Sequence, residues 1–285
     1  MTSSAAAAAS SASASASAAP SPESTRSFQG FRDLRLIGRQ VRFEQLSFWL
    51  NPFGALFTIV FSVLFLVLLS STAGSQNISY YAGIKATQYY VPSFIAYGIM
   101  SSCFNIQAIT LVNRREMGLL KRLRLSPLPT PLLMAAIFIS SMIVAAIGVI
   151  LLFLIGKIAY GVHGPASTLA VVVTTLVGML AFTGLAVGMS TVVPNADAAG
   201  PMVSLTFFLL VAFSGLYFPI QPGSTLSNIA DIFPVRHMIS GMNTAFNAPP
   251  GSSPWPWHDY LVLLAWGVVG SFLALRRWSW SPRRG

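Results

Sequence analysis

Charged residues are scarce in this 285-residue sequence, at 8% of the chain, whereas 54% of the residues are hydrophobic and the mean hydropathy is +0.68. This composition excludes an ordinary soluble domain and indicates a chain that exposes apolar side chains to lipid. The net charge of +10 could indicate nucleic-acid binding, but the bases lie in short flanks around long apolar runs. That pattern is typical of membrane proteins beside anionic headgroups, so we expect membrane lipids as partners and no nucleic acid.

Few residues are available for catalysis or metal binding. The single cysteine, Cys103, excludes an intrachain disulfide and is most simply a packing residue. The three histidines form no HExxH pair, and Gly156-Lys157 lacks the rest of a phosphate-binding loop. The seven acidic residues all fall in flanks or loops, whereas ion-driven carriers usually hold such charges inside the membrane. We therefore expect no catalytic, metal-binding or cofactor-binding residues, and no nucleotide hydrolysis by this chain alone.

The N-terminal part divides into two segments. An Ala/Ser repeat without aromatic residues fills residues 1–25, for which we expect a disordered tail, and residues 26–285 then form the membrane domain. From Phe28 to Phe48, arginines recur at three- and four-residue spacing among apolar side chains, which predicts an amphipathic helix on the membrane surface. The alternative is a basic flank that only orients the first span. The arginines on this face are Arg32, Arg35, Arg39 and Arg42.

Apolar windows long enough to cross a bilayer make up most of the remaining chain. There are six, at about 52–72, 90–112, 131–155, 168–192, 201–219 and 259–275. Prolines separate them, and we expect Pro52, Pro92 and Pro131 in first helical turns, with Pro201 at the boundary of the fifth window. The fold class is therefore expected to be all-α, a polytopic membrane protein with six transmembrane helices.

The distribution of Lys and Arg predicts the orientation. With six spans, fourteen of the seventeen bases fall on one side, and only Lys85, Lys157 and Arg236 fall on the other. Because basic residues are retained in the cytoplasm, both termini are expected there.

The connection between the second and third windows, Asn113 to Pro129, concentrates charge and has internal order. Asn113 and Glu116 have the spacing of a capping box, and Met117, Leu120 and Leu123 form an apolar stripe before Ser126-Pro127. This predicts a short amphipathic cytoplasmic helix that docks on a partner protein, or else one that lies on headgroups. The residues assigned to it are Asn113, Arg115, Glu116, Met117, Gly118, Leu120, Lys121, Arg122 and Leu123.

Two further features concern helix packing. Residues 219–257 carry apolar side chains at three- and four-residue spacing, which predicts one or two short helices broken by Pro234. These would dip into the outer headgroup layer or form a solvated cap. Gly184 and Gly188 would let helices approach closely, either between two chains or, as we prefer, within one chain.

These motifs resemble the permease subunit of type-2 ABC exporters. Residues 116–124, EMGLLKRLR, followed by Ser126-Pro127-Leu128, are similar to the coupling-helix pattern of that family. Residues 214–220, SGLYFPI, followed by Pro222 and Phe233-Pro234, are similar to its second landmark. The resemblance covers the chain after the Ala/Ser tail.

The resemblance implies an architecture and partners. It implies an N-terminal interfacial helix, six spans, a cytoplasmic coupling helix and short extracytoplasmic helices before the last span. A separate ABC ATPase subunit would bind ATP and Mg, a second permease chain would complete a homodimer or heterodimer, and the location would be a plasma membrane, bacterial by this resemblance. Drug-resistance permeases of the daunorubicin type are most similar, so efflux of a drug, secondary metabolite or lipid is expected. The alternatives are export of a polysaccharide or glycolipid, an intramembrane enzyme, or a structural protein.

Overall fold

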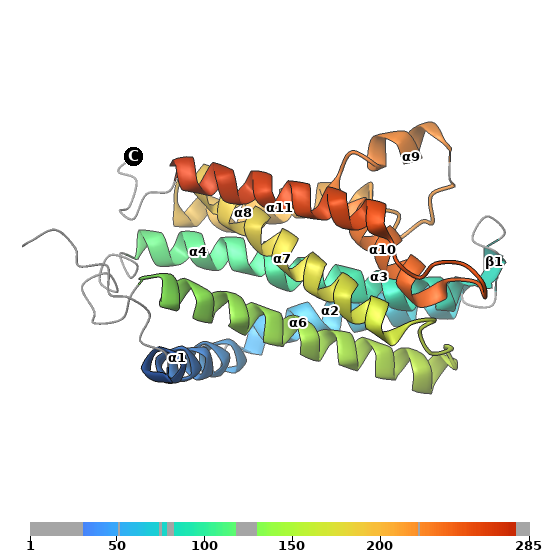
Figure 1. Cartoon of the computed structure of the whole chain (residues 1–285), viewed down its shortest axis with the longest axis horizontal. Helices are drawn as coiled ribbons and strands as arrows, with labels where there is room; N and C mark the ends of the chain where they lie inside the picture. The colour runs from blue at the N-terminus through green and yellow to red at the C-terminus, as the bar shows by residue number, and fades with distance from the viewer. Residues whose placement is uncertain are drawn as a thin grey trace, which may run out of the picture.

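The chain is almost entirely helical in a computed structural model, which describes residues 31–50, 52–73, 76–78, 83–117, 130–221 and 223–277. The exception in these ranges is a two-stranded antiparallel hairpin, β1 (Asn77–Ile78) with β2 (Ile84–Lys85). Long helices run along the long axis of the molecule (Figure 1). The predicted all-α class is confirmed for these residues, whereas the predicted tail at 1–25 lies outside them.

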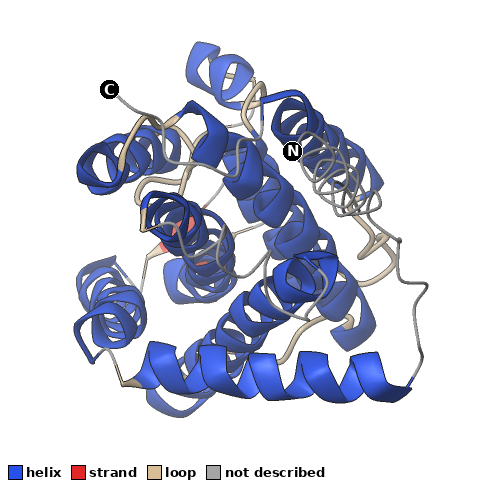
Figure 2. Cartoon of the chain, turned by 90° about the vertical axis from the view of Figure 1, so that its left-hand side faces the viewer, coloured by secondary structure: helices blue, strands red, loops and turns tan. Residues whose placement is uncertain are grey.

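One helix lies across the bundle rather than along it. Helix α1 (Phe31–Trp49) is seen nearly end-on in Figure 1 and side-on, along the lower edge, in Figure 2. It packs against α6, where Gln45 Nε2 donates to both the carbonyl and the hydroxyl of Ser140 at 2.8 Å. Arg35, Arg39 and Arg42 are exposed. This is the orientation that a helix lying on a membrane surface needs.

The long helices follow the predicted windows. They are α2 (Pro52–Ala73), α3 (Ala86–Met100) with the π-helix η1 (Ser101–Ile106) and α4 (Gln107–Glu116), then α6 (Thr130–Tyr160), α7 (Thr168–Val192), α8 (Ala196–Ala212) and α11 (Trp257–Arg277). Among the described residues, four stretches are long and apolar enough to cross a membrane: Ala86–Glu116, Met134–Tyr160, Thr168–Val192 and Trp257–Arg276. Two apolar helices are shorter, Val60–Thr72 and Ala196–Ala212. The chain is thus a multi-pass membrane protein.

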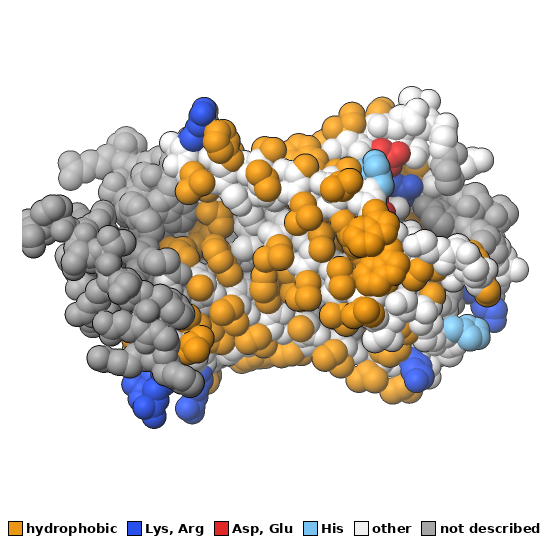
Figure 3. Space-filling model, viewed as in Figure 1, with side chains coloured by type: hydrophobic (Ala, Val, Ile, Leu, Met, Phe, Trp, Pro, Cys, Tyr) orange, Lys and Arg blue, Asp and Glu red, His pale blue; other side chains and the backbone are white. Residues whose placement is uncertain are grey.

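The surface agrees with this assignment. On the face drawn in Figure 3, hydrophobic side chains cover the middle of the molecule, and Lys and Arg side chains lie near its two ends. Apolar residues along the peripheral helices are well exposed, for example Ile150 at 59%, Leu180 at 57% and Val268 at 67%. Exposure of this kind along whole helices is expected where lipid, rather than water, is the solvent.

The fifth window is shifted relative to the prediction. Helix α8 begins at Ala196, because Asn195 Oδ1 accepts the Ala198 N–H at 2.9 Å, so Pro201 lies inside the helix rather than at its boundary. The helix ends at Ala212 instead of residue 219. Ser214 Oγ donates to the Val211 carbonyl at 2.6 Å, and Gly215 follows with φ +85, a conformation that favours glycine.

Pro92 also differs from its predicted place. It lies within the second turn of α3 rather than the first, and it has no N–H to give to the carbonyl of Gln88. Asn247 Nδ2, from α10, donates to that carbonyl at 3.1 Å. A side chain from a distant segment thus supplies the hydrogen bond that the proline removes.

Helix α3 lies at the centre of the bundle, in contact with α2, α6, α7 and α10. The most apolar part of Ala86–Glu116 is 72% buried, against 28% for Met134–Tyr160. Phe94, Ile99 and Met100 are fully buried here. Helix α6 therefore faces outward, and α3 forms the core.

Helices α7 and α11 approach most closely at glycines. A Cβ added to Gly184 would lie 2.5 Å from the Gly267 carbonyl oxygen, and one added to Gly188 would lie 2.7 Å from that of Gly270. Neither position has room for a side chain. The two glycines singled out in the sequence thus lie at a contact within one chain.

Two short helices precede α11, as the sequence suggests, and their environments differ from each other. Helix α9 spans Thr225–Ala230, and α10 (Pro234–Asn247) starts with the predicted proline. Most of α10 is buried against α3, α7 and α11, and Trp266 Nε1 donates to the Ile232 carbonyl at 3.1 Å. Because Trp266 lies well inside α11, the α9–α10 turn lies alongside this helix. Helix α10 is thus part of the core rather than a cap or a headgroup-layer helix. Leu226 and Ile229 of α9 are half exposed, so for α9 both alternatives stay predictions.

Candidate coupling site at the basic end of the bundle

The segment predicted to dock starts at Asn113, near the end of the bundle at which α1, the last turn of α4 and the end of α11 are all found (Figure 1). We call this the basic end, and the end with β1, β2 and α10 the far end. Asn113, Arg115, Glu116 and Met117 are described by the structure, and the remaining predicted docking residues lie outside the described ranges: Gly118, Leu120, Lys121, Arg122 and Leu123. The docking helix therefore stays a prediction, and the structure shows the residues that immediately precede this segment in the sequence.

The predicted N-terminal cap at Asn113 is wrong. Helix α4 runs through Asn113 to Glu116, and the Asn113 carbonyl accepts the Met117 N–H at 3.0 Å, as in a last helical turn. The physical reason is that no glycine or proline interrupts the sequence from residue 99 to residue 117, so the preceding helix continues. Glu116 therefore lies at the end of a helix rather than at its start.

Arg115, assigned from the sequence to the docking surface, is buried, with 3% exposure. Its guanidinium donates to three backbone carbonyls at the end of α7: Ser190 at 2.9 Å, Val193 at 2.9 Å and Pro194 at 3.1 Å. The last carbonyls of a helix lack partners within it, so a buried arginine satisfies them and also complements the helix dipole. Arg115 Nε additionally donates to Glu116 Oε1 at 3.0 Å.

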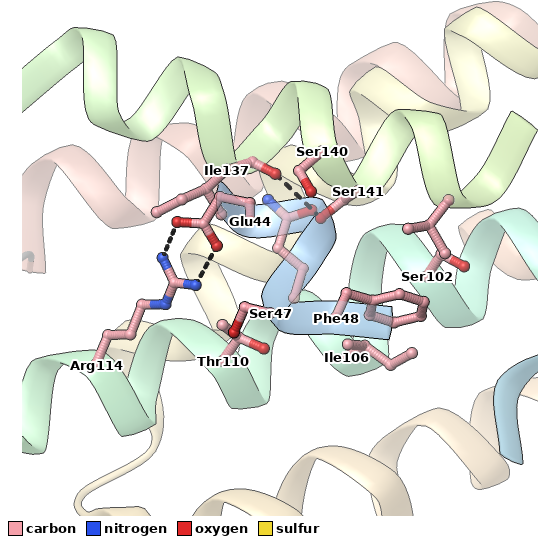
Figure 4. Close-up of a pocket in the computed structure, with 12 residues that line it drawn as sticks. Glu44, Ser47, Phe48, Ser102, Ile106, Thr110, Arg114, Ile137, Ser140 and Ser141 are labelled. Carbon is pink, nitrogen blue, oxygen red and sulfur yellow. Dashed lines mark hydrogen bonds and ion pairs between the residues drawn. The ribbon is translucent and has the colours of Figure 1, made fainter. Parts of the chain in front are cut away.

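Arg114, the preceding residue, connects α4 to α1. Its two terminal nitrogens donate to the two carboxylate oxygens of Glu44, and one of these hydrogen bonds is 2.8 Å long (Figure 4). Glu44 is 6% exposed and also accepts from Gln40 Nε2 at 2.9 Å. Paired contacts of this kind are the strong form of an arginine–carboxylate interaction. The sequence carried no signal for it, because the partners are 70 residues apart.

Together, Arg114 and Arg115 form what we call the arginine anchor. It fixes the last turn of α4 to α1 on one side and to the α7–α8 connection on the other. The anchor immediately precedes the segment predicted to dock.

A polar cavity of about 210 Å³ lies beside the anchor, between α1, η1, α4 and α6 (Figure 4). The buried Gln107 lines it, and its Nε2 has no hydrogen-bond partner among the described residues. The cavity's two charges, on Glu44 and Arg114, neutralise each other, so the site suits water or a small neutral polar group rather than an ion. Hydroxyl groups supply most of its other polar atoms, from Ser47, Ser102, Thr110, Ser140 and Ser141.

Comparison with known proteins identifies the family. A family model described as "ABC-2 family transporter protein" matches residues 65–276. The chain belongs to the ABC-2 transporter family. The match starts within α2 and includes the arginine anchor, so the resemblance read from residues 116–124 is confirmed at the level of the family.

One relative extends this finding. The ABC-2 chain is 25% identical over 190 residues to "Putative transport permease YvfS" of Bacillus subtilis (strain 168), and the alignment covers 65% of this chain and 75% of YvfS. The family match and the membrane-spanning helices together identify this chain as a membrane transporter protein. Helix α1 precedes the residues that the family model matches, so its basic face and its contact with Arg114 are observations on this chain's own structure.

Proposed function

We propose that this chain is the transmembrane permease subunit of an ATP-driven exporter, working with a separate ABC ATPase subunit that binds ATP and Mg and with a second permease chain. The observation that carries this proposal is the arginine anchor. It joins α1, α4 and the α7–α8 connection, and the charged segment 118–129 follows it directly in the sequence. A docking segment attached there can act on three elements together.

The proposed coupling follows from the continuity of α3, η1 and α4. These elements form one helical stretch from Ala86 to Glu116 through the core. When the ATPase subunits close, a displacement of residues 118–129 is passed to α4 and thence to the centre of the bundle. The π-helix η1 lies midway, and single π turns within α-helices are frequent at functional positions. Closely packed helices respond to such a displacement by switching between discrete arrangements.

The proposed topology has six crossings, made by α2, α3–α4, α6, α7, α8 and α11, with the basic end in the cytoplasm. Helix α8, with 17 residues, is only about 26 Å long at 1.5 Å per residue, slightly less than the hydrocarbon thickness. Polar and charged groups of α1 and the anchor then lie at the cytoplasmic headgroups.

The proposed substrate class is amphipathic or hydrophobic: a drug, a secondary metabolite or a lipid. A cavity of about 260 Å³ between α7, α8, α10 and α11 supports this class, because apolar side chains make up most of its lining, including Phe182, Phe207 and Leu210. A polysaccharide would instead require polar groups along its path.

Co-purification tests this proposal. The tagged chain, isolated from its native membrane in mild detergent, is expected to bring down an ABC ATPase and to contain two permease chains per complex. The complex should hydrolyse ATP, and the chain freed from the ATPase should not. Hydrolysis by a preparation with no second polypeptide, or recovery of the chain without any ATPase under conditions that preserve other transporters, would contradict the proposal.

A further inference from the structure

Two histidines and an aspartate from different segments meet at the far end of the bundle. His237 lies in the first turns of α10, and His258 and Asp259 begin α11. One ring nitrogen of each histidine and one carboxylate oxygen of Asp259 all lie within 4.8 Å of one another. The two imidazole rings are 5.3 Å apart between centroids. The sequence did not indicate this group, because His237 precedes Asp259 by 22 residues and lies on a different helix.

The hydrogen bonds of His237 fix which of its nitrogens faces the other two residues. Nε2 lies 2.8 Å from the backbone carbonyl of Asp231, and a carbonyl can only accept, so Nε2 carries the hydrogen. Nδ1 lies 2.6 Å from Asp259 Oδ1 and points toward the cluster. Metal-binding histidines are usually held in this way, with the second ring N–H given to a backbone carbonyl.

The burial of the three residues also suits an ion. His237 is 4% exposed and Asp259 is 9% exposed, so two of the three groups are already held in place. His258 is exposed on the surface of α11, which leaves a path from solvent to the cluster. Figure 3 shows a histidine side chain next to acidic and basic side chains at this end of the molecule.

We propose that His237, His258 and Asp259 form a binding site for Zn²⁺ or a similar divalent transition metal. Two imidazoles and one carboxylate are ligands that zinc accepts, with a water in the fourth position, whereas calcium and magnesium prefer oxygen ligands. Binding requires the ligand atoms to approach the ion to about 2.0–2.2 Å, and rotation of the exposed His258 side chain provides that adjustment. The ion would replace the proton between His237 Nδ1 and Asp259, which is released to solvent on binding. It would then connect the start of α10 to the start of α11.

The test measures zinc binding to the full-length chain. The protein is purified in detergent through a tag without histidine, stripped with a chelator and titrated with ZnCl₂ against a chromophoric zinc indicator. We expect one zinc per chain. His258→Ala, which changes an exposed residue, should weaken binding by at least about tenfold, since even the loss of a group that only supports a ligand costs roughly 10- to 100-fold.

His163→Ala is the matched control, because His163 is an exposed histidine outside the cluster. It should bind zinc as the unchanged protein does. The melting temperature should rise on zinc addition in the unchanged protein and in His163→Ala, but not in His258→Ala. Equal zinc affinity in His258→Ala and the unchanged protein would overturn the proposal, as would an equal loss in both variants, which would indicate adventitious surface binding only.

Discussion

Arg115 is a charged side chain with almost no solvent exposure, and its three carbonyl acceptors explain how the bundle accommodates it. Burial of a charge is unfavourable unless hydrogen bonds replace its hydration. Here one acceptor is a carbonyl of the last turn of α7, from Ser190, and the other two belong to Val193 and Pro194 just after it, so the arginine and these carbonyls satisfy one another. Arg115 therefore stabilises the fold, in addition to preceding the segment predicted to dock.

Replacement of Arg115 by methionine tests this account. Arg115→Met keeps an apolar stem but leaves buried carbonyls without a donor, which costs roughly 1–3 kcal/mol for an unsatisfied group. We expect a clearly lower melting temperature for the detergent-purified protein. The control is Arg39→Met on the exposed face of α1, where substitutions usually change stability by less than about 0.5 kcal/mol. If the two variants melt alike, the Arg115 contacts do not stabilise the fold.

The sequence predicted a special role for this residue but assigned it to the wrong surface. Asn113 and Glu116 have the spacing of a capping box next to an apolar stripe, which predicts the start of a separate helix with Arg115 on its surface. The acceptors of Arg115 lie 75 to 79 residues away, and no local spacing reports on them. A short polar motif can be part of a cap or of a tertiary contact, and only the packing of distant helices decides between the two.

At the scale of elements, α1 is held by two polar contacts with different partners. Glu44 pairs with Arg114 of α4, and Gln45 donates to Ser140 of α6. The arginine spacing predicted the basic face of α1. It did not predict the side that packs on the bundle, because nothing near Glu44, one of only two acids in α1, shows that its partner is Arg114 of α4.

A double-mutant cycle on the Glu44–Arg114 pair tests whether α1 takes part in coupling. Glu44→Gln or Arg114→Gln leaves one largely buried charge without its partner, and such losses cost several kcal/mol. Each single variant should therefore lower substrate-stimulated ATP hydrolysis by the assembled complex. The double variant retains two neutral amides and should recover part of the activity. Losses that simply add would show that the two residues act independently.

The α7–α11 contact yields a second test at this scale. Gly184→Ala places a Cβ against the Gly267 backbone, which cannot move without separating the helices, so overpacking of roughly 1–3 kcal/mol is expected. Gly148→Ala in α6 is the matched control, because nothing lies within 4 Å of its added Cβ. The melting temperature should fall for Gly184→Ala and stay level or rise for Gly148→Ala. A thermostable Gly184→Ala protein would contradict the close approach of these helices.

For the whole molecule, hydropathy predicted the four long apolar helices found among the described residues but not how they are arranged. The windows for α3–α4 and α6 both read as spans, yet one is mostly buried and the other mostly exposed. Lipid and protein interior are equally apolar, so hydrophobicity cannot separate the central helix from the peripheral one. Helix α10 is a different case, because its moderately polar sequence resembles a surface helix although most of it is buried against α3, α7 and α11.

The orientation of the molecule can be tested with cysteines at its two ends. Lys85 is exposed at the far end and Arg39 is exposed at the basic end, and Cys103 is fully buried, so Cys103→Ser gives a background without thiols. In that background, Lys85→Cys should react with a membrane-impermeant maleimide in intact cells, whereas Arg39→Cys should react only after the membrane is opened. The reason is the fourteen-to-three division of basic residues, which are retained on the cytoplasmic side. The thiol-free chain is the control for background labelling.

If Arg39→Cys is labelled in intact cells and Lys85→Cys is not, the basic end faces outward. The arginine anchor could then not receive a cytoplasmic ATPase.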